Sequence, residues 1–296
     1  MIKKFLILIT VVFSSLSFAQ QGSSSPYSFY GIGSLQFKGT VENQSMGGLS
    51  VYSDSIHINL RNPASFAGKN LKSFNNEARP IKYTIGGSHS NIKLSSGSQT
   101  GKSSTTSVDY LAIAIPLGKF GAGFGILPYT SVGYKLQSID SEGVLQYKYR
   151  GEGGVNKVFL GFGYQLTDNF RFGADASYNF GNIKNTNIAF GYNSQGELLQ
   201  YQSRESNRSN LGGLTYNFGL IFSKLIKPSL EVTASATYSP TSELTSSNSR
   251  AYSTIAIDPI TQQEFTISVS EVDLSPFNLN TTQLTSKSIM AGIHIW

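Results

Sequence analysis

Three histidines, His57, His89 and His294, are the residues of this chain best suited to metal binding or proton transfer. They lie far apart in the sequence, and none has a spacing typical of a metal site or of an activated nucleophile. Folding can still bring a histidine near a serine, which leaves a lipase or acyltransferase as an alternative, but no nucleophile motif supports it. We therefore expect no enzyme activity, no catalytic residue, no metal and no cofactor.

Arg171 and Asp175 are the charged pair with the clearest placement, because both fall on the same face of one predicted strand. The favoured interpretation is an inward ion pair in which each charge compensates the other. The alternative is a polar contact in the lumen with a carboxylate or head group.

The stretch 155–181 contains the strand that positions this pair, together with a neighbouring strand. Phe170, Phe172, Ala174, Ala176, Tyr178 and Phe180 alternate with Arg171, Gly173, Asp175, Ser177, Asn179 and Gly181. Period-two alternation is typical of a β-strand, and Thr167-Asp168-Asn169 supplies a turn before it. Each strand has about ten residues or more, the length that a tilted strand needs to cross a bilayer. This stretch therefore predicts a membrane hairpin.

Further strands with the same pattern extend the prediction to an all-β, transmembrane antiparallel barrel. We expect eight spanning strands, at 81–95, 106–117, 120–137, 155–167, 170–190, 210–225, 230–246 and 284–296. Short turns should alternate with long polar loops at 96–105, 138–154, 191–209 and 247–283, the last holding a hairpin of 253–257 and 264–269. The apolar set would face lipid and the polar set the lumen. A soluble barrel would invert this orientation.

Targeting signals indicate the outer membrane of a Gram-negative bacterium. Residues 1–19 read as a signal peptide, with Lys3 and Lys4 before an apolar run and a cleavage signal ending at Ala19. The chain has no cysteine, so it offers neither a disulfide nor a lipid-bearing cysteine. Its net charge of +6 becomes +4 without Lys3 and Lys4, and the excess is scattered, which argues against nucleic-acid binding. Residues 20–79 are an irregular segment before a barrel at 80–296.

The strand 120–137 has an unusual composition. Gly121, Gly123 and Gly125 occupy one face, and Pro128 interrupts the other. Proline cannot donate a ladder hydrogen bond, and glycines inside a strand mark bends or bulges. We predict a kink or local opening of the wall here, the alternative being a proline at the membrane edge.

The N-terminal segment contains three short motifs, Met46-Gly47-Gly48, Asp54-Ser55 and Asn62-Pro63-Ala64, which precede the alternating strands. With these motifs in this place, the segment resembles that of the FadL-like family of outer-membrane transporters. This resemblance implies a fourteen-stranded barrel with an N-terminal hatch that contains Gly47, Gly48, Asn62, Pro63 and Ala64, and a kinked third strand. Since eight strands are visible here, the chain would be a fragment of such a barrel.

The resemblance implies uptake of long-chain fatty acids or other hydrophobic small molecules, gated by the hatch and with lateral exit into the membrane. Outer-membrane lipid and a hydrophobic ligand would then be the partners. The alternative function is a barrel that does not transport and that serves as an accessory platform for protein secretion or assembly, with protein partners. A passive structural barrel is a third possibility.

Overall fold

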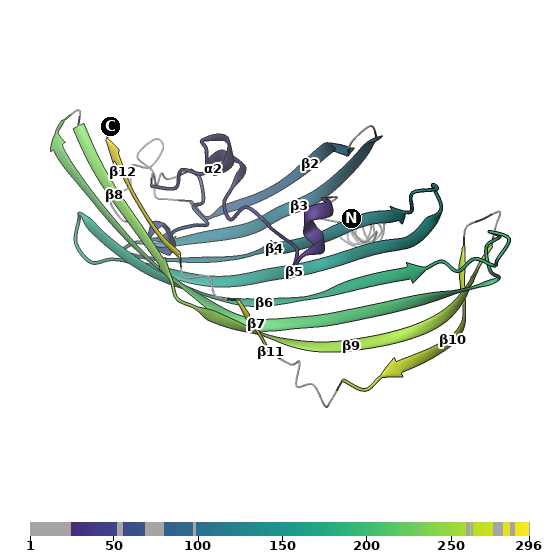
Figure 1. Ribbon diagram of the computed structural model, residues 1–296. Coiled ribbons are helices and arrows are strands. Elements are labelled where there is room, and N and C mark those ends of the chain that lie inside the picture. Colours follow the sequence, from purple (N-terminus) through teal and green to yellow (C-terminus); the bar gives the residue numbers. More distant parts are fainter. Residues whose placement is uncertain are drawn as a thin grey trace, which may run out of the picture.

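The fold is a single curled β-sheet (Figure 1). The computed structural model describes residues 25–51, 56–68, 80–96, 99–228, 230–258, 261, 263–274, 281–284 and 288–295, and the predicted signal peptide lies outside these ranges. The strands are β1 (Ser34–Leu35), β2 (Lys82–Ser96), β3 (Gln99–Leu117), β4 (Phe120–Ile139), β5 (Leu145–Gln165), β6 (Phe170–Ala189), β7 (Tyr201–Lys227), β8 (Leu230–Ser239), β9 (Ser242–Ile257), β10 (Glu264–Val272), β11 (Thr281–Leu284) and β12 (Ser288–Ile295). Helical turns are η1 (Pro26–Phe29), α2 (Val41–Ser45) and η2 (Pro63–Phe66). The all-β prediction is confirmed.

The strands form one antiparallel sheet whose main path runs β10-β9-β7-β6-β5-β4-β3-β2. β9 pairs with the N-terminal half of β7 and β8 with its C-terminal half, so these two strands together occupy one strand position beside β7. β10 and β11 pair with β9, and β12 pairs with β8, so these three strands occupy the next position. The sheet curls into a half-barrel. Within the described residues β2 forms no ladder with β10, β11 or β12, so these strands do not close a barrel, and the complete fourteen-stranded barrel that the FadL-like resemblance implied is not shown.

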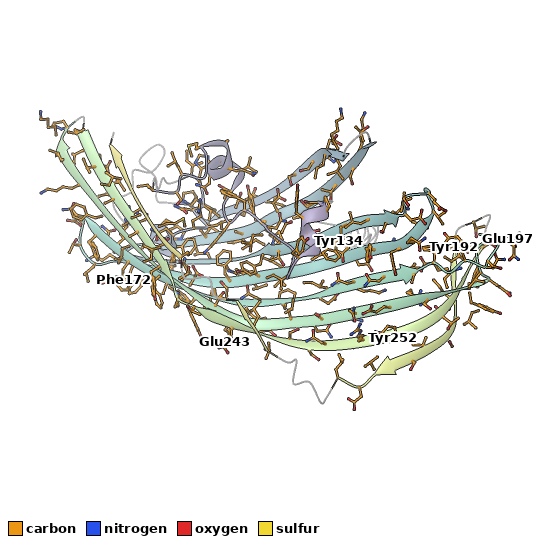
Figure 2. The ribbon with its side chains drawn as sticks, in the orientation of Figure 1. Tyr134, Phe172, Tyr192, Glu197, Glu243 and Tyr252 are labelled. Carbon is orange, nitrogen blue, oxygen red and sulfur yellow. The ribbon has the colours of Figure 1, made fainter. Side chains whose placement is uncertain are left out.

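β6 shows how the alternating sequence determines the two faces of the sheet. Phe172 is 43% and Tyr178 53% exposed, whereas Ser177 is 2% and Asn179 0% exposed. Successive side chains of a strand point to opposite faces, so the aromatic set lies outside, as Phe172 does in Figure 2, and the polar set lies inside. This is the orientation predicted for a membrane barrel and the opposite of that in a soluble barrel.

Exposed apolar side chains continue around the convex face on neighbouring strands. We call these residues the apolar band: Tyr83, Ile85, Leu111, Ile113, Ile115, Phe120, Phe124, Leu160, Phe162, Phe172, Tyr178, Phe180, Leu214, Tyr216, Phe218, Leu220, Phe222 and Tyr238. They lie toward the end of the sheet that carries the short turns, such as Gly118-Lys119 between β3 and β4. No helix among the described residues has the length and apolarity needed to cross a membrane.

The strands continue through polar segments that we predicted to be loops. The prediction is wrong for 96–105 and 138–154, because most of these residues extend the ladders between β2 and β3 and between β4 and β5. It is wrong in part for 191–209, where 201–209 belong to β7 and extend its ladders with β6 and β9, whereas 191–200 connect β6 to β7. β7 alone has 27 residues. Ladder hydrogen bonds join main-chain groups and do not require apolar side chains, so pairing persists where the apolar alternation stops. The predicted hairpin is confirmed in β9 and β10, where Glu264 pairs with Ile257.

Candidate functional site on the concave face

The described part of the N-terminal segment, residues 25–51 and 56–68, lies on the concave face of the sheet (Figure 1). Its turn η2 (Pro63–Phe66) is buried throughout. Asn62 caps this turn, since its Oδ1 accepts a hydrogen bond from Ala64 N at 3.0 Å. Pro63 fits at the first position of the turn, where its missing N–H is not needed. The structure therefore brings Asn62, Pro63 and Ala64, predicted as hatch residues, together against the sheet.

The side chain of Asn62 also bonds to the sheet itself. Its Nδ2 donates to Leu220 O on β7 at 3.2 Å and to Ser235 Oγ on β8 at 2.9 Å. Asn62 is 0% exposed, so water does not reach these groups from outside. One buried amide thus joins the N-terminal segment to two strands far along the chain.

Glycines form the floor on which η2 lies. We call this set the glycine floor: Gly121, Gly123, Gly161, Gly163, Gly173 and Gly219. A Cβ on Gly163 would lie 2.8 Å from Ala67 N and from Pro63 O, and a Cβ on Gly173 would meet Ala64 N and the Pro63 carbonyl. These are main-chain atoms of a buried turn, which cannot move aside as a side chain can. The absence of Cβ atoms therefore sets how closely the segment approaches the sheet.

Phe66 fills a depression above the glycine floor. A Cβ on Gly161 would lie 2.7 Å from its ring, and a Cβ on Gly123 would also meet the ring. The ring stacks on Phe159 with centroids 6.5 Å apart and an angle of 8° between the planes. Phe66 belongs to a buried cluster with Ile58, Leu60, Tyr110, Ala112, Ala114, Leu127 and Phe159. The contact of the Phe66 ring with the sheet thus depends on two glycines and one aromatic residue.

Arg171 and Asp175 lie on the same concave face and bond to different groups. Arg171 Nη1 donates to Ala67 O at 3.4 Å, at the end of η2. Asp175 Oδ2 accepts from Asn217 Nδ2 at 2.8 Å, and the same amide donates to Arg61 O at 3.3 Å. Both predicted lumenal residues therefore contribute to holding the N-terminal segment, Arg171 directly and Asp175 through Asn217.

Gly47 and Gly48 form a turn after α2. Their φ angles of +70° and +85° favour glycine at both positions. Gly48 O accepts a hydrogen bond from Arg61 Nη1 at 2.5 Å, and the Arg61 guanidinium lies 5.4 Å from the centre of the Phe37 ring. Arg61 thus ties this turn to the residues just before η2.

A cavity of about 160 Å³ remains beside these contacts, lined by Lys38, Tyr129, Lys157, Asp175 and Asn217 among others. Burial lowers the pKa of Lys38; the Asp175 carboxylate opposes this shift, and the positive charge of Arg61 adds to it. The lining includes two lysines, Lys38 and Lys157, and one carboxylate, Asp175, and the cavity is much smaller than a typical pocket for a drug-sized ligand.

β4, the strand with the unusual composition, borders a gap in the sheet. Its ladder with β3 ends at the pair Leu111 and Ile126, and the ladder with β5 has a bulge between Pro128 and Thr130. β1 of the N-terminal segment pairs with Thr130 and Ser131 beyond that point. Gly121 and Gly123 belong to the glycine floor, whereas a Cβ on Gly125 would lie 2.6 Å from the main-chain oxygen of Leu111 on β3. Whether the wall opens here for a molecule to pass stays a prediction.

Groups suited to catalysis are not assembled in the described part of the chain. His89 Nδ1 lies 2.7 Å from Thr106 Oγ1 on an exposed ladder, and the side chain of His294 is outside the description. Among the residues described, no three His, Asp or Glu side chains gather as metal ligands would. The expectations of no enzyme activity, no metal and no cofactor stay predictions.

Sequence reasoning missed Phe66, Ser235, Asn217 and four residues of the glycine floor, Gly161, Gly163, Gly173 and Gly219, and it gave Gly121 and Gly123 a different role, a kink of the wall. One signal was available: inward positions of neighbouring predicted strands carry glycine instead of a larger polar residue. Glycine inside a strand often marks a close approach of other main chain. The contacts of Ser235 and Asn217 had no comparable signal, because they depend on pairing across the sheet.

The comparisons with known proteins give one match. The family model described as BamG matches residues 1–295. No curated protein and no solved structure matches the chain. The FadL-like assignment is therefore wrong. Its main motif, Asn62-Pro63-Ala64, is a capped turn that begins with proline, a general local structure that does not identify a transporter. Because the match covers nearly its entire length, the chain belongs to the BamG family.

Proposed function

We propose that this protein takes part in the assembly of outer-membrane proteins as an accessory component of the BAM complex. The observation that carries this proposal is the BamG family match over residues 1–295. It agrees with the alternative drawn from the sequence, a barrel-like platform with protein partners. Uptake of fatty acids or other hydrophobic molecules is wrong, because it was implied only by a family to which the chain does not belong.

We further propose that the sheet is embedded in the outer membrane through the apolar band. Along β6 the band extends from Phe170 to Phe180, which is ~33 Å at ~3.3 Å per residue. A strand tilt of ~40° reduces this to ~25 Å, the height of the apolar band of outer-membrane barrels. Exposed aromatic residues on the convex face, such as Phe172 and Tyr178, support this placement.

A charge placed in the middle of the apolar band tests the membrane placement. Ala176→Arg lies on the outward face of β6, midway along the band, and should destabilise the protein in phospholipid vesicles by about 2–4 kcal/mol. Asn182→Arg is the matched control on the same strand and face, six positions farther along and beyond the band, and should cost about 1 kcal/mol or less. Urea unfolding in vesicles measures both variants. Equal losses would contradict a membrane-embedded band.

The assembly role is tested by isolating the protein with its partners. The full chain with an affinity tag, extracted in mild detergent, should co-purify BAM components in near-stoichiometric amounts. Depletion of the protein should lower the outer-membrane levels of several unrelated barrel proteins. A chain that purifies alone, and whose loss leaves those levels unchanged, would favour a passive structural role and refute the proposal.

For the described part of the N-terminal segment, residues 25–51 and 56–68, we propose a hatch-like role in which it stays docked on the concave face. The proposal is supported by the buried contacts of Asn62 and Phe66 with the sheet. A docked segment would keep the curled sheet in one shape, so that partners meet a constant surface. Gly47 and Gly48 belong to the hatch in this proposal through the bond of Gly48 to Arg61.

A further inference from the structure

A second cavity, of about 400 Å³, lies on the part of the sheet beyond the apolar band. Five basic side chains line it, Lys135, Lys148, Arg150, Lys184 and Arg204, together with the acidic Glu152 and Glu264. We call this set the basic pocket. These side chains carry a net charge of +3 near neutral pH, on a chain in which only 14% of residues are charged.

The basic pocket is on the same outward face as the apolar band. On β6, Lys184 is four residues after Phe180, and alternation places both on one side of the strand, about 13 Å apart. Lys184 pairs with Glu152 of β5, and Lys135 of β4 pairs with Arg150 of β5. Directly paired residues of neighbouring strands project to the same face. The pocket therefore borders the apolar band and is separated by the sheet from the concave face.

Charges within the pocket are only partly compensated. Arg204 Nη1 lies 3.3 Å from Glu264, and Lys184 Nζ lies 3.9 Å from Glu152. Lys148 stacks over the Phe190 ring at 5.2 Å. In the described structure, Lys135, Lys148 and Arg150 have no acidic partner within ion-pair distance. Three cations from two adjacent strands thus remain available to an anion.

We propose that the basic pocket binds the phosphate groups of a lipid headgroup whose acyl chains lie along the apolar band. A band that contacts acyl chains places the surface next to it at headgroup depth, where phosphate is the main anion. Each basic residue near an anionic lipid surface strengthens binding to it about fivefold. With the short turns toward the periplasm, as in outer-membrane barrels, the pocket lies at the outer leaflet.

An acidic polypeptide is a less suitable ligand for this position. It would have to contact the sheet where lipid already surrounds the neighbouring band, with its chain at the membrane surface. One lipid molecule can fill both regions, because its phosphates are covalently linked to its acyl chains and the pocket borders the apolar band. The inference rests on the proposed membrane placement, and it does not depend on the BAM partners.

Native mass spectrometry of the full chain in detergent, titrated with lipid A, tests the proposal. Lipid A with two phosphates should bind at least about tenfold more tightly than lipid A with one. Lys135→Gln, Lys148→Gln and Arg150→Gln combined should weaken binding roughly a hundredfold, since each basic residue contributes about fivefold. The matched control removes three exposed cations near the short turns, Lys119→Gln, Lys224→Gln and Lys227→Gln, and should bind as the wild type does.

Several outcomes would overturn the proposal. Equal loss in both triple variants would mean that only net charge matters. Displacement of lipid A by inorganic phosphate at matched concentration would identify a free anion as the ligand. Polyglutamate binding that depends on the three residues, without lipid A binding, would indicate an acidic polypeptide. Two measurements distinguish a failure of the lipid A proposal from a failure of the proposed function. They are the co-purification of BAM components by the triple variant of Lys135, Lys148 and Arg150, and the effect of Ala176→Arg on stability in vesicles.

Discussion

Valine in place of Gly173 is expected to displace the N-terminal segment from the concave face. The new side chain would occupy the space of Ala64 N and the Pro63 carbonyl, which are main-chain atoms of a fully buried turn. Overpacking of a buried site typically costs about 1–3 kcal/mol, and a rigid main-chain contact belongs at the upper end of this range. We expect the amide hydrogens of Ala64 and Ser65 to exchange at least about tenfold faster.

Hydrogen exchange followed by mass spectrometry measures this effect on peptides covering 56–68. Ala174→Val is the matched control, because it adds methyl groups at the adjacent position, whose side chain points to the exposed convex face. Unchanged exchange in Gly173→Val would mean that the turn does not lie against β6. Faster exchange in both variants would indicate a general loosening of the strand.

Alanine in place of Phe66 is expected to have the second large effect. The ring is 5% exposed and belongs to the buried cluster above the glycine floor. Removing a buried phenylalanine ring typically costs about 3–5 kcal/mol, because the surroundings do not fill the cavity. Urea unfolding of the reconstituted protein should show this loss. Tyr27→Ala, which removes an 80% exposed ring from the same segment, should stay within about 0.5 kcal/mol of the wild type.

A double-mutant cycle locates the effect of Phe66. Gly123→Val alone should destabilise the protein, because its side chain would meet the Phe66 ring. In the Phe66→Ala background the same substitution should be almost neutral, since the space is then empty. Residues in contact show such coupling, and distant residues do not. Additive effects of the two substitutions would place the ring elsewhere.

The regular strands and the orientation of their faces could be predicted from the sequence. In β6, six apolar residues alternate with six small or polar ones, and the alternation determines which set is exposed. Asn62-Pro63-Ala64 could also be recognised locally, because an asparagine followed by a proline indicates the start of a turn within three residues. Local patterns of this kind depend on neighbours along the chain and can be read without the fold.

Three other features could not be predicted. The strands continue through polar segments because their ladders join main-chain groups, which side-chain polarity does not report. Ser235 and Asn217 contact the segment only because β7 and β8 curl beneath it. The function was misassigned for a related reason: the FadL-like resemblance depended on three short motifs before the alternating strands, and one of them, Asn62-Pro63-Ala64, is a capped turn of a kind that many folds use.

The bond between Asn62 and Ser235 has a consequence for the order of folding. The two residues are 173 positions apart in the chain, so the contact closes a very long loop, whose entropic cost must be met before the contact contributes. The segment that emerges first during synthesis can therefore acquire its binding surface only after β7 and β8 have formed. Docking of the N-terminal segment should be among the slowest steps of maturation, and a docked segment indicates that the sheet is fully curled.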